Sequence, residues 1–378
     1  MDFELTPSQE AQITQARART KFVLDELGGD TSMSPAYWRA MGREGWLGLC
    51  LNENNTKRTE AALDAVLVHE TLGLAGLPRG HLFAAGAHFF GCTMGIANFG
   101  TPKQRERWCP ALTSGQCVGA LAFTEPSGGS DLAACNTTLK NDQDGLSLSG
   151  RKTYVTNGAT AGVFLVLAKS GSQDGPFNMS VLIVPRSTPG LTVRAHLDVH
   201  GLATSAPAEI TFEDCRLTPE CLLGTQGAGL GVLLGIMQWE RSCILAGLLG
   251  ALELDIKRVS SYLGQRRASG TSPMQHQSVA HAVARLSLRT KAARLMLYRG
   301  AWELDHGNDK LVQPAMSKLM ISETLLDGAT ELLRLTAGFG WSGGLGLGQA
   351  LDDVVGTLSA SGTSEIQLNT IAAGLVNS

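Results

Sequence analysis

The feature of this sequence that most restricts its fold is a change of texture along the chain, from helical patterns to short strands and back. Between Cys117 and about Leu223, β-rich runs are separated by turn clusters such as residues 141–145 and 185–190. Strands spaced so closely, without helices between them, predict an antiparallel sandwich or barrel. The predicted strands cover residues 147–150, 163–167, 179–184, 191–195 and 209–212.

Helical signals fill both flanks of this central stretch. Ser34-Pro35 and Thr101-Pro102 each place a capping residue before a proline, which is typical of a helix start. Apolar spacing predicts the later helices over residues 229–263, 275–306 and 313–339, with a short one near 365–375. We therefore predict an α+β fold with an N-terminal helical domain (1–116), a central β domain (117–223) and a C-terminal helical domain (224–378).

Composition excludes several classes of protein. The 31 basic and 34 acidic side chains give a net charge of −3, which excludes a global nucleic-acid-binding field. The longest apolar stretch, residues 229–252, is interrupted by Glu240-Arg241, so we predict no membrane span. The eight cysteines form no CxxC pair, and the first residues are acidic where a signal peptide would be basic. We expect a cytoplasmic protein with reduced thiols and no metal site.

Glu240 is the one residue whose setting suggests chemistry. Its helix neighbours three and four positions away are Ile236, Met237, Cys243 and Ile244, all apolar. Burial there would raise the pKa of the carboxylate unless a cation lies close, and such a group suits general-base catalysis. The alternative is a structural ion pair with an arginine on another helix.

A basic segment, residues 257–302, carries nine Lys or Arg side chains and no Asp or Glu. Such a segment would attract phosphates or an acidic protein partner. The alternative is a solvated helix face that neighbouring acidic helices neutralise.

The letters GxGxxG occur once near the C-terminus, from Gly338 to Gly343. They follow a predicted helix and lie in no βαβ unit, so a Rossmann dinucleotide loop is not predicted.

Three motifs resemble those of the acyl-CoA dehydrogenase family. They are Leu121-Ala122-Phe123-Thr124-Glu125-Pro126-Ser127-Gly128-Gly129-Ser130-Asp131, Gly150-Arg151-Lys152-Thr153-Tyr154-Val155-Thr156-Asn157-Gly158 and Gly362-Thr363-Ser364-Glu365-Ile366-Gln367. Their order and spacing fit over essentially the full chain. The resemblance implies a central β-barrel, a C-terminal four-helix bundle, non-covalent FAD between the two and usually a homotetramer.

The resemblance also implies a reaction, the α,β-desaturation of an acyl thioester. In this family a glutamate removes the α-proton while FAD accepts the β-hydride. Many members carry that base directly before the GTSEIQ element, where this chain has Ser361. Other branches place it on the first bundle helix, in a stretch that resembles Trp239-Glu240-Arg241. The resemblance therefore also identifies Glu240 as the base.

The resemblance assigns the cofactor residues one by one. Thr124 and Thr156 would bond the flavin ring next to Phe123 and Tyr154, the latter in place of the usual Trp. Further contacts are implied for Ser130, Arg267, Gln277, Gly338, Gly340, Thr363 and Glu365, with Arg267 reaching the FAD of a neighbouring subunit.

The sequences around Glu240, residues 294–299 and residues 315–323 are similar to dehydrogenases acting on carrier-protein thioesters, most of all the prolyl-carrier-protein dehydrogenases. This likeness implies an acyl or peptidyl carrier protein as partner, and the basic segment fits such an acidic protein. The alternatives are a catabolic acyl-CoA dehydrogenase, a flavin monooxygenase or an inactive homologue serving as an assembly partner.

Overall fold

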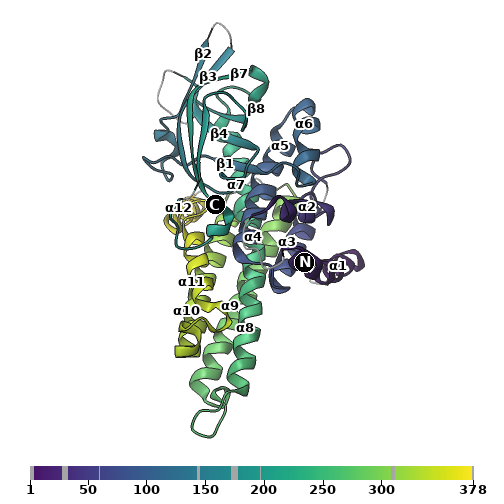
Figure 1. Cartoon of the computed structure of the whole chain (residues 1–378), viewed down its shortest axis with the longest axis vertical. Helices are drawn as coiled ribbons and strands as arrows, with labels where there is room; N and C mark the ends of the chain where they lie inside the picture. The colour runs from purple at the N-terminus through teal and green to yellow at the C-terminus, as the bar shows by residue number, and fades with distance from the viewer. Residues whose placement is uncertain are drawn as a thin grey trace.

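The computed structural model describes residues 4–27, 33–58, 60–142, 145–171, 178–195, 197–307 and 311–376. A sheet lies at one end, a long helical bundle extends away from it, and the N-terminal helices pack beside their junction (Figure 1). The order of helices, strands and helices confirms the predicted α+β fold class.

The N-terminal region consists of helices whose starts follow the predicted capping signals. Ser34 accepts a hydrogen bond from the Tyr37 N–H, and Thr101 forms a reciprocal capping box with Gln104. The helices are α1 (Pro7–Leu27), α2 (Pro35–Arg43), α3 (Ala61–Leu74), α4 (Arg79–Gly86), the π-helical η1 (Ala87–Thr93), α5 (Met94–Phe99) and α6 (Pro102–Thr113).

The central region is one eight-stranded sheet. Its hydrogen-bonded order is β6-β7-β3-β2-β4-β5-β8, and β1 pairs with β4. The strands are β1 (Gly119–Ala122), β2 (Thr138–Asp142), β3 (Gly145–Val155), β4 (Val163–Lys169), β5 (Met179–Pro185), β6 (Leu191–Ala195), β7 (Ala208–Leu217) and β8 (Leu222–Leu223).

One detail of the sheet differs from the prediction, because it is mixed rather than wholly antiparallel. β1 runs parallel to β4, and β2 meets β4 in parallel at Thr138 and Lys169. The β2–β3 hairpin occupies the connection between β1 and β4. That crossover is long enough to bring β4 back in the same direction as β1, which a tight turn would not allow.

The C-terminal region contains the bundle, with one break that the sequence hides. The helix predicted over 229–263 is divided at Ile244 and Leu245. The sequence did not predict this break, because apolar residues continue through it. The helices are α7 (Gly229–Cys243), α8 (Ala246–Gln265), α9 (Gln277–Asp305), α10 (Val312–Trp341), α11 (Leu347–Val355) and α12 (Ser364–Val376), of which α11 was not predicted.

Two helical stretches, Arg79–Phe99 and Gly229–Gln265, have the length and hydropathy of membrane-crossing helices. In this fold 89% and 83% of those windows are buried inside the molecule. Their apolar side chains therefore form the protein core here.

Candidate active site

Glu240 lies near the end of α7, where the bundle meets the sheet. Its exposed fraction is only 7%, and in the described part of the chain no ion pair reaches its carboxylate. Burial raises the pKa of Glu240 to about 7, against the smaller opposing effects of the Ser361 hydroxyl and of the neighbouring Arg241. The buried, unpaired glutamate predicted from the apolar helix pattern is therefore present, and its pKa suits proton transfer near neutral pH.

Ser361 faces Glu240 from the turn before α12. The two positions at which relatives would carry the base, 240 and 361, thus meet at one point of the structure. The Ser361 hydroxyl lies close enough to oppose part of the rise in the Glu240 pKa, but it is buried and completes no hydrogen bond among the described residues.

The turn carrying Ser361 is held by three side chains from three helices. Arg241 of α7 donates from Nε to the Ser361 carbonyl at 3.0 Å. Lys318 of α10 donates to the carbonyls of Leu358 and Gly362, both at 2.9 Å, and Gln367 of α12 donates to those of Ser361 and Gly362. Arg241 therefore binds the turn rather than clamping the Glu240 carboxylate.

Thr124 and Thr156 follow the C-terminal ends of β1 and β3. The Thr153 N–H donates to the Thr124 carbonyl at 2.9 Å, which ties the two motifs together. Phe123 belongs to the same buried cluster as Met237, one helical turn before Glu240. The sheet motifs and Glu240 are thus connected through a common core.

A buried charge cluster lies beneath Thr124. The Glu125 carboxylate accepts hydrogen bonds from Cys135, from the Asn136 N–H, from the Thr137 N–H and hydroxyl, and from Lys152 at 2.8 Å. Burial raises the Glu125 pKa, but these hydrogen bonds and the Lys152 charge outweigh it and hold the pKa well below its usual range. Lys152 also donates to the Phe123 carbonyl and so fixes the backbone beside Thr124.

The surroundings of Thr124 and Thr156 fit an isoalloxazine ring. Among the described residues no hydrogen bond reaches either hydroxyl, so both remain available to a ligand. Tyr154, two residues before Thr156, is 66% exposed and has a left-handed backbone with φ +54°, at an irregularity in the pairing of β3 with β7. The two motifs, joined by the Thr153–Thr124 hydrogen bond, thus carry two hydroxyls that can form hydrogen bonds to a flat heterocycle and an exposed aromatic ring that can stack on one.

The other proposed cofactor residues do not all gather there. Arg267 and Gln277 flank the α8–α9 connection at the end of the bundle opposite the sheet (Figure 1). Gly338 and Gly340 lie at the end of α10, near the same end, where Phe339 stacks on Tyr262 of α8 at 4.4 Å. One chain therefore divides the predicted cofactor residues between two distant places.

The remaining predicted residues lie near the sheet and the Ser361 turn. Ser130 is exposed on the turn after Thr124. Thr363 caps α12 by accepting from the Ile366 N–H, and Glu365 is exposed in the first turn of that helix. The backbone N–H of Glu365 itself and the Thr363 hydroxyl hold the Glu365 pKa below its ordinary value.

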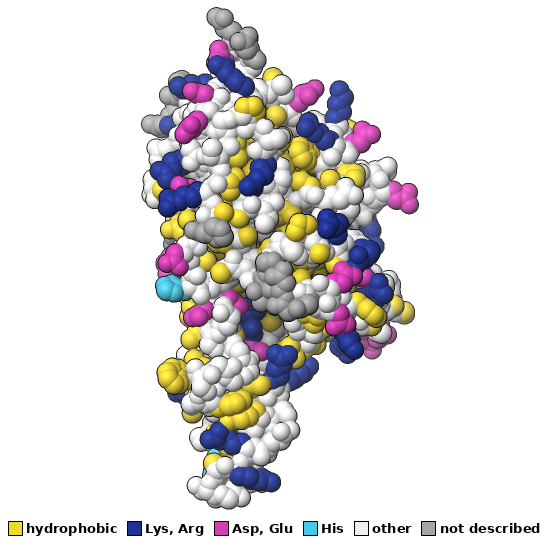
Figure 2. All heavy atoms as spheres, in the orientation of Figure 1, with side chains coloured by type: hydrophobic (Ala, Val, Ile, Leu, Met, Phe, Trp, Pro, Cys, Tyr) yellow, Lys and Arg dark blue, Asp and Glu magenta, His cyan; other side chains and the backbone are white. Residues whose placement is uncertain are grey.

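The predicted basic segment is partly neutralised. Lys257, Arg289, Arg294 and Arg299 form ion pairs with carboxylates on α3, α8, α9 and α10. Figure 2 shows further Lys and Arg side chains at the lower end of the bundle, with few acidic side chains visible beside them. The segment is therefore a mixture of the two interpretations that the sequence left open.

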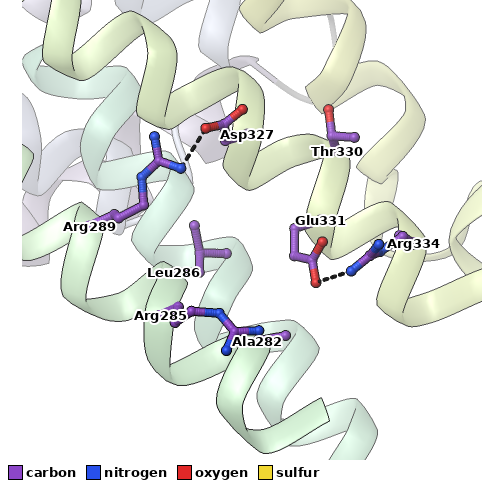
Figure 3. Close-up of a pocket in the computed structure, with 8 residues that line it drawn as sticks. All are labelled: Ala282, Arg285, Leu286, Arg289, Asp327, Thr330, Glu331 and Arg334. Atoms are coloured by element: carbon purple, nitrogen blue, oxygen red, sulfur yellow. Dashed lines mark hydrogen bonds and ion pairs between the residues drawn. The ribbon is translucent and has the colours of Figure 1, made fainter. Parts of the chain in front are cut away.

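A cavity of about 340 Å³ lies between α9 and α10, apart from Glu240. Arg285, Arg289 and Arg334 share it with Asp327 and Glu331, and the dashed lines in Figure 3 join Arg289 to Asp327 and Arg334 to Glu331. Two ion pairs and the further charge of Arg285 line it, so it does not suit the apolar part of an acyl thioester.

The structure also shows where the GxGxxG letters and the cysteines lie. Gly338 and Gly340 form the end of a helix, as expected for a sequence that is no Rossmann loop. All eight cysteines are free, and the described residues contain no cluster of His, Cys, Asp or Glu able to hold a metal ion.

Sequence reasoning missed the supporting residues Lys152, Arg241, Lys318 and Gln367. Each is buried and donates to a backbone carbonyl, and all but Gln367 reach a carbonyl on a different part of the chain. A charged residue at an apolar position was the available signal for Lys318, which has Ala315, Ile321 and Ser322 on the same helix face.

Comparison with known proteins agrees with this geometry. The N-terminal, middle and C-terminal domain profiles of acyl-CoA dehydrogenases match residues 11–116, 120–215 and 227–376. The L-prolyl-[peptidyl-carrier protein] dehydrogenase of Pseudomonas fluorescens is 33% identical over 99% of this chain and 100% of its own length. A short-chain specific acyl-CoA dehydrogenase of Sus scrofa is 32% identical over 75% of this chain and 69% of its own.

Solved structures give the same result. The FAD complex of PigA superposes with a TM-score of 0.94 at 30% identity, covering 100% of this chain and 99% of PigA. The relative from Pseudomonas fluorescens and the PigA superposition both extend across all three regions of the fold, which confirms the resemblance predicted from the three motifs. The chain belongs to the acyl-CoA dehydrogenase family.

Proposed function

We propose that this chain is an FAD-dependent dehydrogenase that desaturates an aminoacyl group, prolyl above all, held as a thioester on a carrier protein. The observation that carries this proposal is the buried Glu240, whose pKa of about 7 lies at neutrality and whose carboxylate has no ion-pair partner among the described residues. The full-length likeness to a prolyl-carrier-protein dehydrogenase supports the substrate.

Glu240 removes the proton from the carbon next to the thioester carbonyl. Its low exposure excludes water and keeps the carboxylate reactive, while its raised pKa lets it hold the proton at neutral pH. Thr124 and Thr156 would hold the isoalloxazine, and Tyr154 would lie against it. FAD, when bound, supplies the acceptor for the hydride that leaves the β-carbon.

Carrier-protein docking through positive charge is part of this proposal. Carrier proteins are acidic, and Arg258 of α8 is exposed and outside the ion pairs of the described residues. The apparent KM for a loaded carrier should rise steeply with salt, and Arg258→Glu should raise it further at low salt. A KM that ignores both ionic strength and this charge reversal would contradict docking through the basic segment.

We also propose a homo-oligomer of two or four chains, in the cytoplasm. α9 exposes Leu288, Leu295 and Trp302, by 69%, 54% and 42%, at a seven-residue spacing that forms one stripe. A second copy would cover this stripe, because exposed apolar surface of this kind is typical of an interface. Arg267 and Gln277, far from Thr124 in one chain, would then reach FAD held by another.

The decisive experiment compares substrates on the purified holoenzyme. Prolyl-loaded carrier protein should bleach the flavin, and mass spectrometry should show that its prolyl group has lost hydrogen. Butyryl-CoA should bleach the flavin far more slowly. Faster bleaching by butyryl-CoA would instead favour the short-chain acyl-CoA dehydrogenase alternative, which the relative from Sus scrofa keeps open. Gain of an oxygen atom by the product would indicate a monooxygenase. Absence of bleaching with every thioester tested would indicate an inactive homologue.

A further inference from the structure

The turn that carries Ser361 has an unusual backbone. Ser361 has φ +57°, in the left-handed region that a non-glycine residue seldom adopts, and Gly362 follows with φ +98°. A side chain at Gly362 would lie 2.8 Å from the Gln367 amide nitrogen and 3.2 Å from the Arg241 guanidinium. Such a conformation persists only where its surroundings impose it, and it is concentrated at functional sites.

The surroundings here are the three donors described above. Arg241, Lys318 and Gln367 bind the carbonyls of Leu358, Ser361 and Gly362, and Lys318 and Gln367 are almost wholly buried. With its carbonyls engaged by these side chains, the turn is fixed in one orientation. The Ser361 side chain is thereby held at the Glu240 carboxylate.

The Ser361 hydroxyl is nevertheless unsatisfied. Its oxygen is buried and has no hydrogen-bond partner among the described residues. Buried hydroxyls in folded proteins nearly always have a partner, so an orphan held in place by so many contacts calls for one that arrives with a ligand. The ligand that comes to Glu240 is the substrate.

The place of this hydroxyl limits which substrate atom can satisfy it. Glu240 must reach the proton on the α-carbon, so a group beside its carboxylate lies near the substituents of that carbon. Apart from the thioester carbonyl, which both classes of substrate share, a simple acyl chain carries only hydrogen and carbon there. An α-aminoacyl group carries a nitrogen with an N–H.

We propose that Ser361 is the residue that recognises the nitrogen on the substrate α-carbon, and so selects α-aminoacyl over simple acyl thioesters. This inference rests on the proposed function and names the feature of the chain that sets its substrate class. The Ser361 oxygen accepts a hydrogen bond from the substrate N–H, which gives the buried hydroxyl the partner that it lacks among the described residues. A simple acyl group leaves the hydroxyl buried without a partner, which disfavours that substrate.

The test compares two thioesters on the same carrier protein, prolyl and cyclopentanecarbonyl, which differ by one nitrogen in the ring. Flavin bleaching is followed at increasing carrier concentration, so that the apparent Kd and the limiting rate are obtained separately. Ser361→Ala keeps the volume and backbone of the site and removes only the oxygen. Ser359→Ala is the matched control, because Ser359 is exposed on the same turn and bonds only the Gly356 carbonyl among the described residues.

In the unaltered protein the prolyl thioester should be preferred, and Ser361→Ala should reduce that preference about 10- to 100-fold, as expected for one lost hydrogen bond to a buried polar group. Ser359→Ala should leave the preference unchanged, and the visible flavin spectrum should verify that each variant holds FAD.

An equal slowing of both thioesters by Ser361→Ala would overturn the inference and assign Ser361 to tuning Glu240 alone. An unchanged preference would overturn it as well. Failure of the unaltered protein to bleach with prolyl-carrier would instead contradict the proposed function, so the two failures are distinguishable.

Discussion

Glu125 and Glu240 are buried to nearly the same degree, with exposed fractions of 5% and 7%, yet their pKa values move in opposite directions. The Glu125 carboxylate, under the sheet motif, accepts five hydrogen bonds, and the one from Lys152 is also an ion pair. The Glu240 carboxylate, in the bundle, has a serine hydroxyl nearby and a guanidinium that is engaged elsewhere. The pKa of Glu125 falls well below its usual range and that of Glu240 rises to about 7.

The difference teaches that burial alone does not decide what a carboxylate can do. Donors that converge on Glu125 stabilise its charged form, so it anchors the backbone beside Thr124 and has no tendency to take a proton. Arg241, the cation nearest in sequence to Glu240, instead donates to the Ser361 carbonyl. Because that donor is engaged elsewhere, Glu240 remains free to act as a base.

The largest expected effect is the loss of flavin reduction in Glu240→Gln. The amide has nearly the same shape but cannot accept the α-proton, so the bleaching rate should fall by about 10²- to 10⁴-fold while FAD stays bound. Stopped-flow absorbance with prolyl-loaded carrier measures this. Normal bleaching by the variant would remove Glu240 from the mechanism.

Lys152→Met tests the other glutamate, Glu125, whose charge we expect to matter for stability rather than for catalysis. Removing the buried cation leaves a charged carboxylate without its ion-pair partner, which should lower the free energy of unfolding by about 3–5 kcal/mol. Urea denaturation at saturating FAD measures the loss. The double variant Glu125→Gln/Lys152→Met is the matched control and should recover part of it, whereas equal losses in both would show that the charge of Glu125 is not the cause.

The two glutamates should also give opposite pH dependences of stability. A carboxyl whose folded pKa is raised binds more protons in the folded state, so the Glu240 contribution declines as the pH rises from about 4.5 to about 7, by about 3 kcal/mol. The depressed pKa of Glu125 gives a contribution that is present above about 4.5 and lost as the pH falls. Between pH 5 and pH 8 the free energy of unfolding of Glu240→Gln should lack the decline seen in the unaltered protein. Curves of unfolding free energy against pH that run parallel for the two proteins would contradict the prediction.

Much of the fold could be predicted because its signals are local. Prolines after Ser34 and Thr101 fix two helix starts, and turn clusters divide the central strands. The parallel pairing of β1 with β4 could not be predicted, because it depends on which strands meet after the β2–β3 hairpin forms. The break at Ile244 has no Gly, Pro or polar residue to announce it.

The site divides in the same way. Glu240 was visible because a charged residue in an apolar helix is a local anomaly, and Ser361 because it replaces the base that many relatives carry at that position. Their meeting in space depends on the packing of α7 against the turn before α12, and the donors that fix this turn come from α7, α10 and α12. The Arg267 and Gln277 assignments stay predictions, because their place at the far end of the bundle makes sense only with another subunit.

The smallest expected effect comes from Lys318, which touches the turn but not Glu240. Burial lowers the Lys318 pKa to about 8, and its amino group reaches only the carbonyls of Leu358 and Gly362 among the described residues. Lys318→Met should loosen the turn and move the Ser361 hydroxyl away from Glu240. The pH profile of the bleaching rate should then shift on its acid side by a few tenths of a pH unit, equivalent to less than about 1 kcal/mol. If Lys318 acts through Ser361, this shift should vanish in the Ser361→Ala background, because residues that act in one chain of contacts are not additive. The double variant could instead show the full, additive shift, or Lys257→Met on the exposed face of α8 could give the same shift. Either result would show that Lys318 does not act on Glu240 through Ser361 and has only a structural role.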